Sequence, residues 1–458
     1  MKRIGTFISL LFLSVSTLAQ TPEVIREMLA QSSQLVIPTT ATYPAAPLGE
    51  IAKAPEGFEP FHLSLVGRHG SRYHEDIGEI EATHSIYRKA DSLGILTSKG
   101  KELYTALDRI LSAERGHSGE LSALGYNQWL GIAHRLYNNF TPLFGNSNTI
   151  ESRASMVMRC VMSMMAFNQG IKECNDKISI VQYSRKCEMP ILLPLTDNHE
   201  MPKAAKDIYY DYRKEGEWVS ERKAWEERSN CASFISKVTT NRNRFLEECG
   251  GLTDFHSAQT TFAMLNFANN YGEGDQELLH TLFTPEEMYN IYVYATTVWP
   301  NNTIGRGSDV VEMYASYVKP LIDEVMGNAK AAVEGNNLCS ANLYFTHDSY
   351  VFPTLSIIGY EGCVPQYHTD IEKLCTQTKY SLLIPMAANL QFVLYRNKAG
   401  EVLVRSLINE GDAYLPIKCK TAPFYPWEEF CKLVDKNMER LLETRKRVLE
   451  NYGKVVKK

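Results

Sequence analysis

The stretch that most constrains the fold of this chain is an apolar run that stops on a glycine and leads directly into a basic cluster. Residues 63–66 (Leu-Ser-Leu-Val) have the alternating apolar pattern of a β-strand, and Gly67 ends the run. Residues 68–72 (Arg-His-Gly-Ser-Arg) follow at once. Gly67 and Gly70 let the backbone turn sharply and approach a ligand closely. The pattern therefore predicts a strand whose end presents an active site.

The residue types in this cluster indicate phosphate chemistry. The planar guanidinium groups of Arg68 and Arg72 match the oxygens of a phosphate group. A neutral imidazole, here that of His69, can act as a nucleophile when it is held beside a bound phosphate. The alternative is a basic loop that carries one hydrated histidine, and the rest of the chain must decide between the two.

Two further segments repeat the arrangement of a strand followed at once by polar residues. Residues 148–153 form a short predicted strand before a methionine-rich helix over 155–170, with Arg159 in its first turns. Residues 341–345 form another predicted strand, which leads into His347 and Asp348. Strands that alternate with helices favour an α/β fold with a mostly parallel sheet flanked by helices. Ligands bind at the carboxyl ends of such strands, so we expect the three segments to form one site.

The composition changes along the 458 residues in a way that suggests an inserted domain. Residues 203–298 are rich in charged and aromatic side chains and favour helices. A hairpin is expected over residues 390–396 and 402–407, and Gly170 is expected to cap the methionine-rich helix. We expect the following organisation: a signal peptide over 1–19, the first part of an α/β core over 20–190, a mainly α-helical insertion (cap) domain over 191–304, and the second part of the core over 305–458.

The N-terminus has the features of an export signal. Two basic residues at 2–3 precede an apolar run over 7–15 and a small-residue end at Ala19, after which we expect cleavage. The run is too short to span a membrane comfortably, and no later segment is long enough, so no membrane partner is expected. The expected location is the periplasm or the outside of the cell.

Export permits disulfide bonds among the ten cysteines, although a chain of this length does not need them. The local pairs to test first are Cys363 with Cys375 and Cys419 with Cys431. The connectivity stays open. The five methionines of the predicted helix region are expected to pack in the core, at positions Met156, Met158, Met162, Met164 and Met165.

The charge balance and the motifs exclude several classes of function. A formal net charge of −5 argues against a general nucleic-acid binder. No Cys-x-x-Cys pair and no His-Glu-x-x-His helix occurs, so zinc has no support, and no cofactor or metal is expected. The expected partner is a small-molecule phosphate ester, and the oligomeric state stays open.

At these residues the sequence resembles the histidine acid phosphatases, the larger branch of the histidine phosphatase superfamily, which includes phytases and inositol polyphosphate phosphatases. Residues 68–72 resemble the family's Arg-His-Gly-x-Arg signature. Residues 153–159, from Arg153-Ala154-Ser155 to Arg159, are similar to its second arginine segment, and 347–348 match its His-Asp pair. Weaker similarities lie at 119–125 and 407–410.

The chain departs from the family pattern beside the signature. His74 stands where the family usually has proline, and Ser349 stands where threonine is common. We expect Tyr73 and His74 at the rim of the substrate pocket, where His74 would alter substrate preference. The His-Asp-Ser segment is closer to acid phosphatases and many phytases, whereas residues 159–161 and the terminal strand are closer to the inositol polyphosphate type.

The resemblance implies a mechanism and a role for each site residue. His69 would attack phosphorus and form a phosphohistidine that water then hydrolyses. Asp348 would protonate the leaving oxygen and then act as the base for water. The groups expected to neutralise the phosphoryl oxygens are Arg68, Arg72, Arg159 and His347.

The resemblance leaves several functions open. The expected substrates are phytate, inositol phosphates or other organic phosphate esters. A general acid phosphatase of sugar phosphates is one alternative. A phosphotransferase similar to phosphoglycerate mutase is another, although Arg72 and the pair at 347–348 disfavour it. The non-enzyme alternative is a protein that binds phosphate esters without releasing phosphate.

Overall fold

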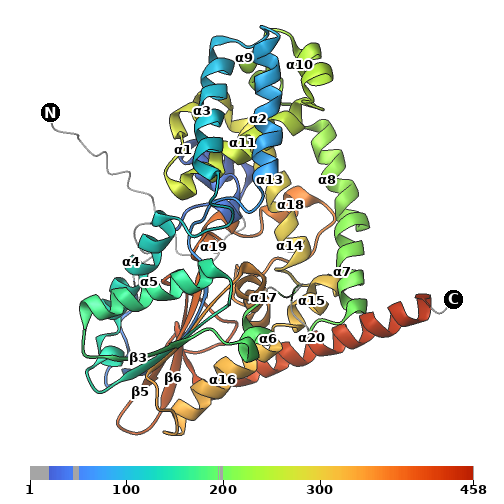
Figure 1. Cartoon of the computed structure of the whole chain (residues 1–458). Coiled ribbons are helices and arrows are strands. Elements are labelled where there is room, and N and C mark those ends of the chain that lie inside the picture. The colour runs from blue at the N-terminus through green and yellow to red at the C-terminus, as the bar shows by residue number, and fades with distance from the viewer. Residues whose placement is uncertain (1–19, 45–50, 194, 196, 198–199, 457–458) are drawn as a thin grey trace.

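A computed structural model describes residues 20–44, 51–193, 195, 197 and 200–456 of the chain. The expected signal peptide and its cleavage point lie outside these residues. The molecule has a part built on a β-sheet and a part built of helices alone, and the sheet part lies below the helical part in Figure 1. The fold is the α/β fold with helical additions that the alternating pattern predicted.

The sheet has a parallel half and an antiparallel half, in the order β3-β2-β4-β1-β5-β6-β7, with β8 paired to β6. Strands β3, β2, β4 and β1 run parallel to one another, and β5 and β6 form the predicted antiparallel hairpin beside β1. The strands are β1 (Glu59–Arg68), β2 (Thr149–Ala154), β3 (Ser179–Tyr183), β4 (Ala341–Thr346), β5 (Asn389–Arg396), β6 (Val402–Ile408), β7 (Gly411–Asp412) and β8 (Phe424–Pro426).

The strand register brings the three polar segments to one edge of the sheet. Arg68, the last residue of β1, pairs with Thr346, the last residue of β4. On the other side of β4, Ala154 at the end of β2 pairs with Phe345. Because these strands are parallel, the residues that follow each of them leave the sheet at the same edge.

Helices cover both faces of the sheet. One face packs against α4 (Ala123–Asn139) and α5 (Met158–Cys174), through a core that includes Trp129 and Phe167. The opposite face packs against a larger group, which includes the long C-terminal helix. That group consists of α6 (Met189–Leu192), α7 (Lys203–Glu215), α15 (Asp309–Ser316), α16 (Lys319–Val333), α17 (Asp348–Ile358), α19 (Tyr380–Leu383) and α20 (Trp427–Val456).

The helical part has its own apolar core, and it draws on segments from before and after the expected insertion. Helices α2 and α3, which follow the signature in the chain, pack there with helices of the 217–296 region, as Figure 1 shows. Its members are α1 (Pro22–Gln31), α2 (Ile77–Ser92), α3 (Ser98–Glu114), α8 (Glu217–Arg228), α9 (Ala232–Val238), α10 (Arg242–Cys249), α11 (Asp254–Phe267), α12 (Gln276–Leu282), α13 (Pro285–Thr296) and α18 (Ile371–Cys375). Helix α14 (Val298–Asn302) follows α13 and leads toward the sheet part.

Several local expectations were wrong. Gly170 was expected to cap α5, but it lies inside this helix, which continues to Cys174. The missing side chain of Gly170 lets α5 pack closely against α4. Of the five methionines expected in the core, only Met164 is buried, and Met158 is 65% exposed because it begins α5 on the outer side. All ten cysteines are free thiols in the structure, so neither expected disulfide pair is bridged. Within the described residues, no helix is both long enough and apolar enough to cross a membrane.

Candidate active site

The end of β1 is held by backbone hydrogen bonds to both of its neighbours. The His69 amide donates to the Thr346 carbonyl of β4 at 3.0 Å, and the Arg68 amide donates to the Ala388 carbonyl before β5 at 2.8 Å. The Gly70 amide donates to Oγ of Ser163 on α5 at 3.0 Å. The signature is therefore fixed by the strands on both sides and by a helix above them.

Helix α4 presses closely against the signature loop. Ser122 is the N-cap of α4, and its amide donates to the Ser71 carbonyl of the loop at 3.0 Å. A Cβ atom at Gly70 would lie 2.5 Å from the Gly125 carbonyl oxygen, and one at Gly125 would lie 2.1 Å from the Ser71 carbonyl oxygen. Both positions therefore require glycine because backbone meets backbone there.

His69 is buried, and its hydrogen bonding leaves one ring nitrogen free of a proton. Its Nδ1 lies 2.9 Å from the Gly70 carbonyl oxygen, which can only accept, so Nδ1 carries the proton and Nε2 carries a lone pair. Burial, and after it the positive charges of Arg68 and Arg159, hold the pKa of His69 well below its usual value of 6.5. The imidazole is thus neutral, which a nucleophile requires.

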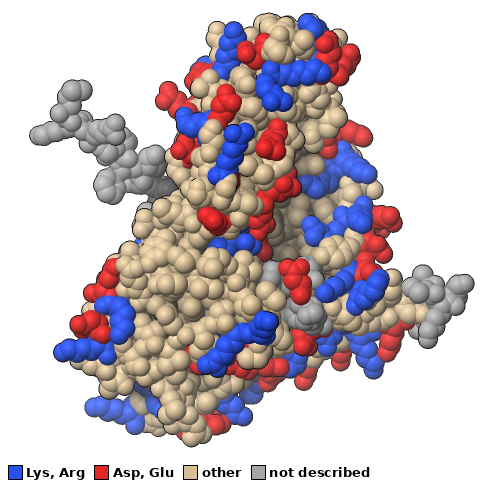
Figure 2. Space-filling model, viewed as in Figure 1, with Lys and Arg blue, Asp and Glu red and all other residues tan. Residues whose placement is uncertain are grey.

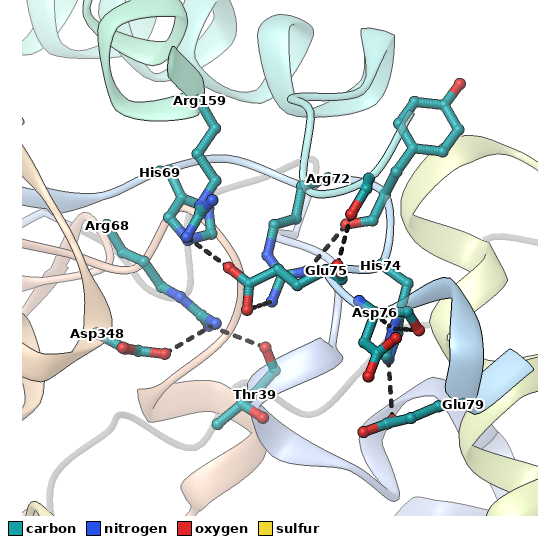
Figure 3. A network of polar contacts seen from close by, with 12 residues as sticks. Thr39, Arg68, His69, Arg72, His74, Glu75, Asp76, Glu79, Arg159 and Asp348 are labelled. Carbon is teal, nitrogen blue, oxygen red and sulfur yellow. Dashed lines mark hydrogen bonds and ion pairs between the residues drawn. The ribbon is translucent and has the colours of Figure 1, made fainter. Parts of the chain in front are cut away.

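The three arginines surround His69 but differ in what holds them (Figure 3). Arg68 is buried, and its Nη1 donates to the carbonyl of Thr39 at 2.8 Å, while its Nη2 lies 3.2 Å from Asp348. Arg72 comes from the loop after β1 and Arg159 from the first turn of α5. The buried Nε–H groups of all three have no hydrogen-bond partner among the described residues.

His347 and Asp348 stand where β4 gives way to α17. His347 is the N-cap of α17 and Asp348 is its first residue, so both lie at a helix N-terminus, which favours anions. Nε2 of His347 lies 3.1 Å from Oγ of Ser155, the residue that follows β2. Burial first, and then Arg159, lowers the pKa of His347 to about 3, so its ring is neutral. It can therefore contribute a hydrogen bond, whereas the sequence analysis expected it to neutralise charge.

All of these groups except Arg68 line one cavity of about 470 Å³ at the ends of β1 and β4. Arg68 lies behind this wall and reaches Asp348 at 3.2 Å. Figure 2 shows a hollow on this side of the molecule, with charged side chains at its margin. The cavity is lined by His69, Arg72, Glu75, Arg159, Asp197, Tyr209, Arg213, Val298, Trp299, Asn302, Thr303, Tyr314, His347, Asp348 and Ser349. The predicted residues His69, Arg72, Arg159, His347 and Asp348 therefore share one cavity wall.

Tyr73 and His74, which we expected at the pocket rim, do not line this cavity. The Tyr73 ring stacks between His117 and Tyr271, at centroid distances of 4.7 and 4.8 Å. His74 points toward Glu79 on α2, with Nε2 3.5 Å from the carboxylate (Figure 3). Both side chains anchor the loop to the helical part because apolar and stacking partners lie on that side.

Arg153, the first residue of the second arginine segment, also lies away from the cavity. Its guanidinium pairs with Glu151 at 2.8 Å and with Glu324 of α16 at 2.6 Å. It therefore ties β2 to a covering helix, and Arg159 is the arginine of this segment that reaches the cavity.

The cavity contains residues that the sequence analysis did not place there. Glu75 lies between Arg72 and Arg159, and Arg213 of α7 also lines the cavity. Tyr209 and Tyr314 stack on each other at 4.4 Å and form part of the wall. Their positions depend on how distant helices pack, and no local motif marks them. Within the described chain, no group of three or more His, Cys, Asp and Glu side chains could hold a metal ion.

The comparison with protein families agrees with this geometry. The model of the histidine phosphatase superfamily (branch 2) matches residues 62–409, a span that runs from β1 to the end of the hairpin. The chain therefore belongs to the histidine phosphatase superfamily (branch 2). It is a phosphatase, a hydrolase of phosphoric monoesters. No curated protein matches the sequence.

Solved structures show the same fold at low sequence identity. The multiple inositol polyphosphate phosphatase of Bifidobacterium longum, in complex with inositol hexasulfate, is 16% identical with a TM-score of 0.69, over 87% of this chain and 97% of that chain. The phytase of D. castellii is 17% identical with a TM-score of 0.66, over 88% of this chain and 85% of that chain. These likenesses confirm the predicted α/β architecture.

Proposed function

We propose that this phosphatase works through a covalent phosphohistidine on His69. The observation that carries the proposal is the Nδ1 contact with the Gly70 carbonyl, which leaves a buried, neutral Nε2 lone pair at the cavity wall. Nε2 attacks phosphorus in line, and the bond from phosphorus to the ester oxygen breaks. Water then attacks the phosphorus, the P–N bond breaks, and inorganic phosphate leaves.

The arginines are proposed to bind the phosphoryl oxygens. The unpartnered buried Nε–H groups of Arg68, Arg72 and Arg159 support this role, because buried donors normally have an acceptor. Fixed donors of this kind stabilise the charge on the oxygens without reorganising during the reaction. His347 is proposed to donate a hydrogen bond to the same group.

Asp348 is proposed to act as the general acid in the first step and as the general base in the second step. It would give its proton to the departing alkoxide and then take one from the attacking water. Its side chain is about one-third exposed and reaches the cavity, so water has access to it for the second step.

The substrate is proposed to be an ester that carries more than one phosphate, such as phytate or another inositol phosphate. Arg213 of α7 supports this proposal because it lines the same cavity, over the ring of Tyr209, and could bind a second phosphate of the substrate. The solved relatives include enzymes named for inositol polyphosphates and phytate. A sugar phosphate is the second candidate, since the cavity of about 470 Å³ accepts it as well.

The nucleophile is tested with His69→Ala. The variant should lose nearly all turnover while its unfolding temperature changes little, and rapid quench of the parent enzyme should trap phosphate on His69. Substantial remaining activity in the variant would exclude covalent catalysis through this residue. Transfer of phosphate to a second hydroxyl instead of water would favour a phosphotransferase.

Substrate class and export are tested separately. Phosphate release is compared for phytate, sugar phosphates and an aryl phosphate, and Arg213→Gln should raise KM for phytate more than for the aryl ester.

Export predicts that the intact mass of the mature protein corresponds to a chain beginning at Gln20. A product that retains Met1 would contradict it.

A further inference from the structure

Glu75 holds the position between two of the three arginines of the site. Its Oε1 lies 2.5 Å from Nη2 of Arg159, and its Oε2 lies 3.5 Å from Nη2 of Arg72. Figure 3 shows the carboxylate directed at both guanidinium groups beside His69. Each of these arginines is at most 15% exposed, so the pairing takes place at the wall of the cavity.

A carboxylate in this position resembles the anion that the site is proposed to bind. It is planar, it is negatively charged, and its two oxygens reach two separate guanidinium groups, as two oxygens of a phosphate would. Glu75 holds the Nη2 groups of Arg72 and Arg159, and a phosphate bound to their free Nε–H groups would lie beside its carboxylate. Two anions on the same guanidinium groups repel each other, so Glu75 and a bound phosphate compete for these two arginines.

The backbone of Glu75 is fixed, while its side chain is free to leave. The Tyr73 amide donates to the Glu120 carbonyl at 2.9 Å, and the Gly119 amide donates to the His74 carbonyl at 2.8 Å. The Ser118 hydroxyl donates to the Glu75 carbonyl. The carboxylate itself is 52% exposed. Rotation about its side-chain bonds moves it from the arginines into water without any change in the loop.

We propose that Glu75 is an internal competitor for the phosphate site, which weakens the binding of inorganic phosphate and so favours product release. The proposal rests on the proposed function, because it takes Arg72 and Arg159 to be phosphate ligands. A substrate with further phosphates has additional contacts, such as Arg213, that offset the displacement of Glu75. Free phosphate has none of them. Glu75 thus sets the preference of the site for esters over the product.

The test is the inhibition constant of inorganic phosphate against hydrolysis of an aryl phosphate. Glu75→Gln keeps the shape of the side chain and removes its charge, and it should lower this constant by about two- to fivefold, the ratios that correspond to about 0.4–1 kcal/mol for one half-exposed ion pair. KM should fall, kcat should stay unchanged or fall together with KM because phosphate leaves more slowly, and progress curves should bend earlier as phosphate accumulates. Glu75→Ala should change the constant in the same direction.

Asp76→Asn is the matched control. Asp76 lies on the same loop and caps α2 through the Gly78 amide at 2.8 Å, a bond that asparagine can keep. It forms no ion pair with the arginines in the described structure, so its variant should leave the inhibition constant unchanged. An equal effect of both variants would overturn the proposal, because it would show a general change of charge.

Arg159→Gln separates failure of this proposal from failure of the proposed function. If it weakens phosphate inhibition while Glu75→Gln leaves it unchanged or weakens it, the phosphate site stands and the competitor role is overturned. If Arg159→Gln has no effect, the assignment of the phosphate site itself is wrong. A fall in kcat on an alkyl phosphate with unchanged KM in Glu75→Gln would instead make Glu75 a proton donor and would also overturn the proposal.

Discussion

Replacing Gly125 by alanine tests whether the site depends on close contact between α4 and the signature loop. A Cβ atom there would lie 2.1 Å from the carbonyl oxygen and 2.7 Å from the amide nitrogen of Ser71. Both are backbone atoms, so no side chain can rotate away to make room. The loop must move by about 1 Å, and it carries His69 and Arg72 with it.

The change in stability that we expect for Gly125→Ala is opposite in sign to the change that helix propensity alone would give. Glycine to alanine inside a helix normally stabilises a protein by about 0.5–1 kcal/mol. Crowding against fixed backbone costs about 1–3 kcal/mol, so Gly125→Ala should be destabilised overall. A displacement of about 1 Å at catalytic groups costs about a hundredfold in rate, and we expect a loss of that order in kcat/KM.

Gly131→Ala on the same helix is the control. A Cβ atom there would meet only the guanidinium end of Arg135 at 3.1 Å, which can shift. This variant should keep its activity and should not lose stability. The assays are kcat/KM for an aryl phosphate and the denaturant midpoint of each variant. If Gly125→Ala matched Gly131→Ala in both kcat/KM and the denaturant midpoint, the close contact between α4 and the signature loop would not position the site.

Three further results are expected. Asp348→Asn should lose much more activity on an alkyl phosphate than on an aryl phosphate, because only the alkyl leaving group needs the proton. His347→Ala should depress both activities to a similar degree. Equal losses in Asp348→Asn would mean that the proton comes from elsewhere, with Glu75, Asp76 or His74 beside the signature loop as the next candidates. The pH–activity profile should show no acid decline centred on 6.5, because burial and the arginines hold the pKa of His69 well below that value; such a decline would mean that His69 is solvated. Burial lowers the pKa of His62 to about 4, so the unfolded chain binds a proton that the native protein excludes, and stability falls as the pH drops from about 6.5 toward 4. The stability lost between pH 7 and about pH 4.5 should be smaller by about 2–3 kcal/mol in His62→Gln than in the parent protein, as measured by denaturant titration. An identical pH dependence of stability in the variant and the parent would contradict this prediction.

The elements that carry the site could be predicted because each is encoded locally. The alternating apolar run before Gly67 and the hairpin expected over 390–396 and 402–407 depend on neighbouring residues, and the structure confirms both. The meeting of Arg68, Arg159 and His347 could also be predicted, because parallel strands bring their carboxyl ends to one edge whatever lies between them. Which side chains turn toward the cavity depends on the packing of distant helices, which no local pattern in the sequence encodes.

The failed expectations concern surfaces that only the packing of distant elements defines. Methionines at 156 and 158 are apolar enough for a core, yet their side chains are 46% and 65% exposed in the described structure. Tyr73 was expected at the pocket because it follows the signature, but the rings of His117 and Tyr271 hold it elsewhere. The position of a residue in the sequence can place its backbone near a site. The orientation of its side chain depends on the contacts that it makes in the tertiary structure.

Glu75 shows that a charged residue within three positions of a recognised motif can be a candidate from sequence while its contacts depend on the fold. A glutamate after a basic signature is an ordinary solvated charge by composition, and its loop is anchored by residues 118–120, which lie more than forty positions away in the chain. That anchoring, and the arrival of Arg159 on α5 from the other side, place the carboxylate between two guanidinium groups. The charge balance of the site, three guanidinium groups facing the carboxylates of Glu75 and Asp348, is thus a product of the fold. The Glu75 carboxylate can also leave the arginines by rotation of its side chain into water. This is possible because the Glu75 side chain is half exposed, while the arginines it contacts are held at the cavity wall.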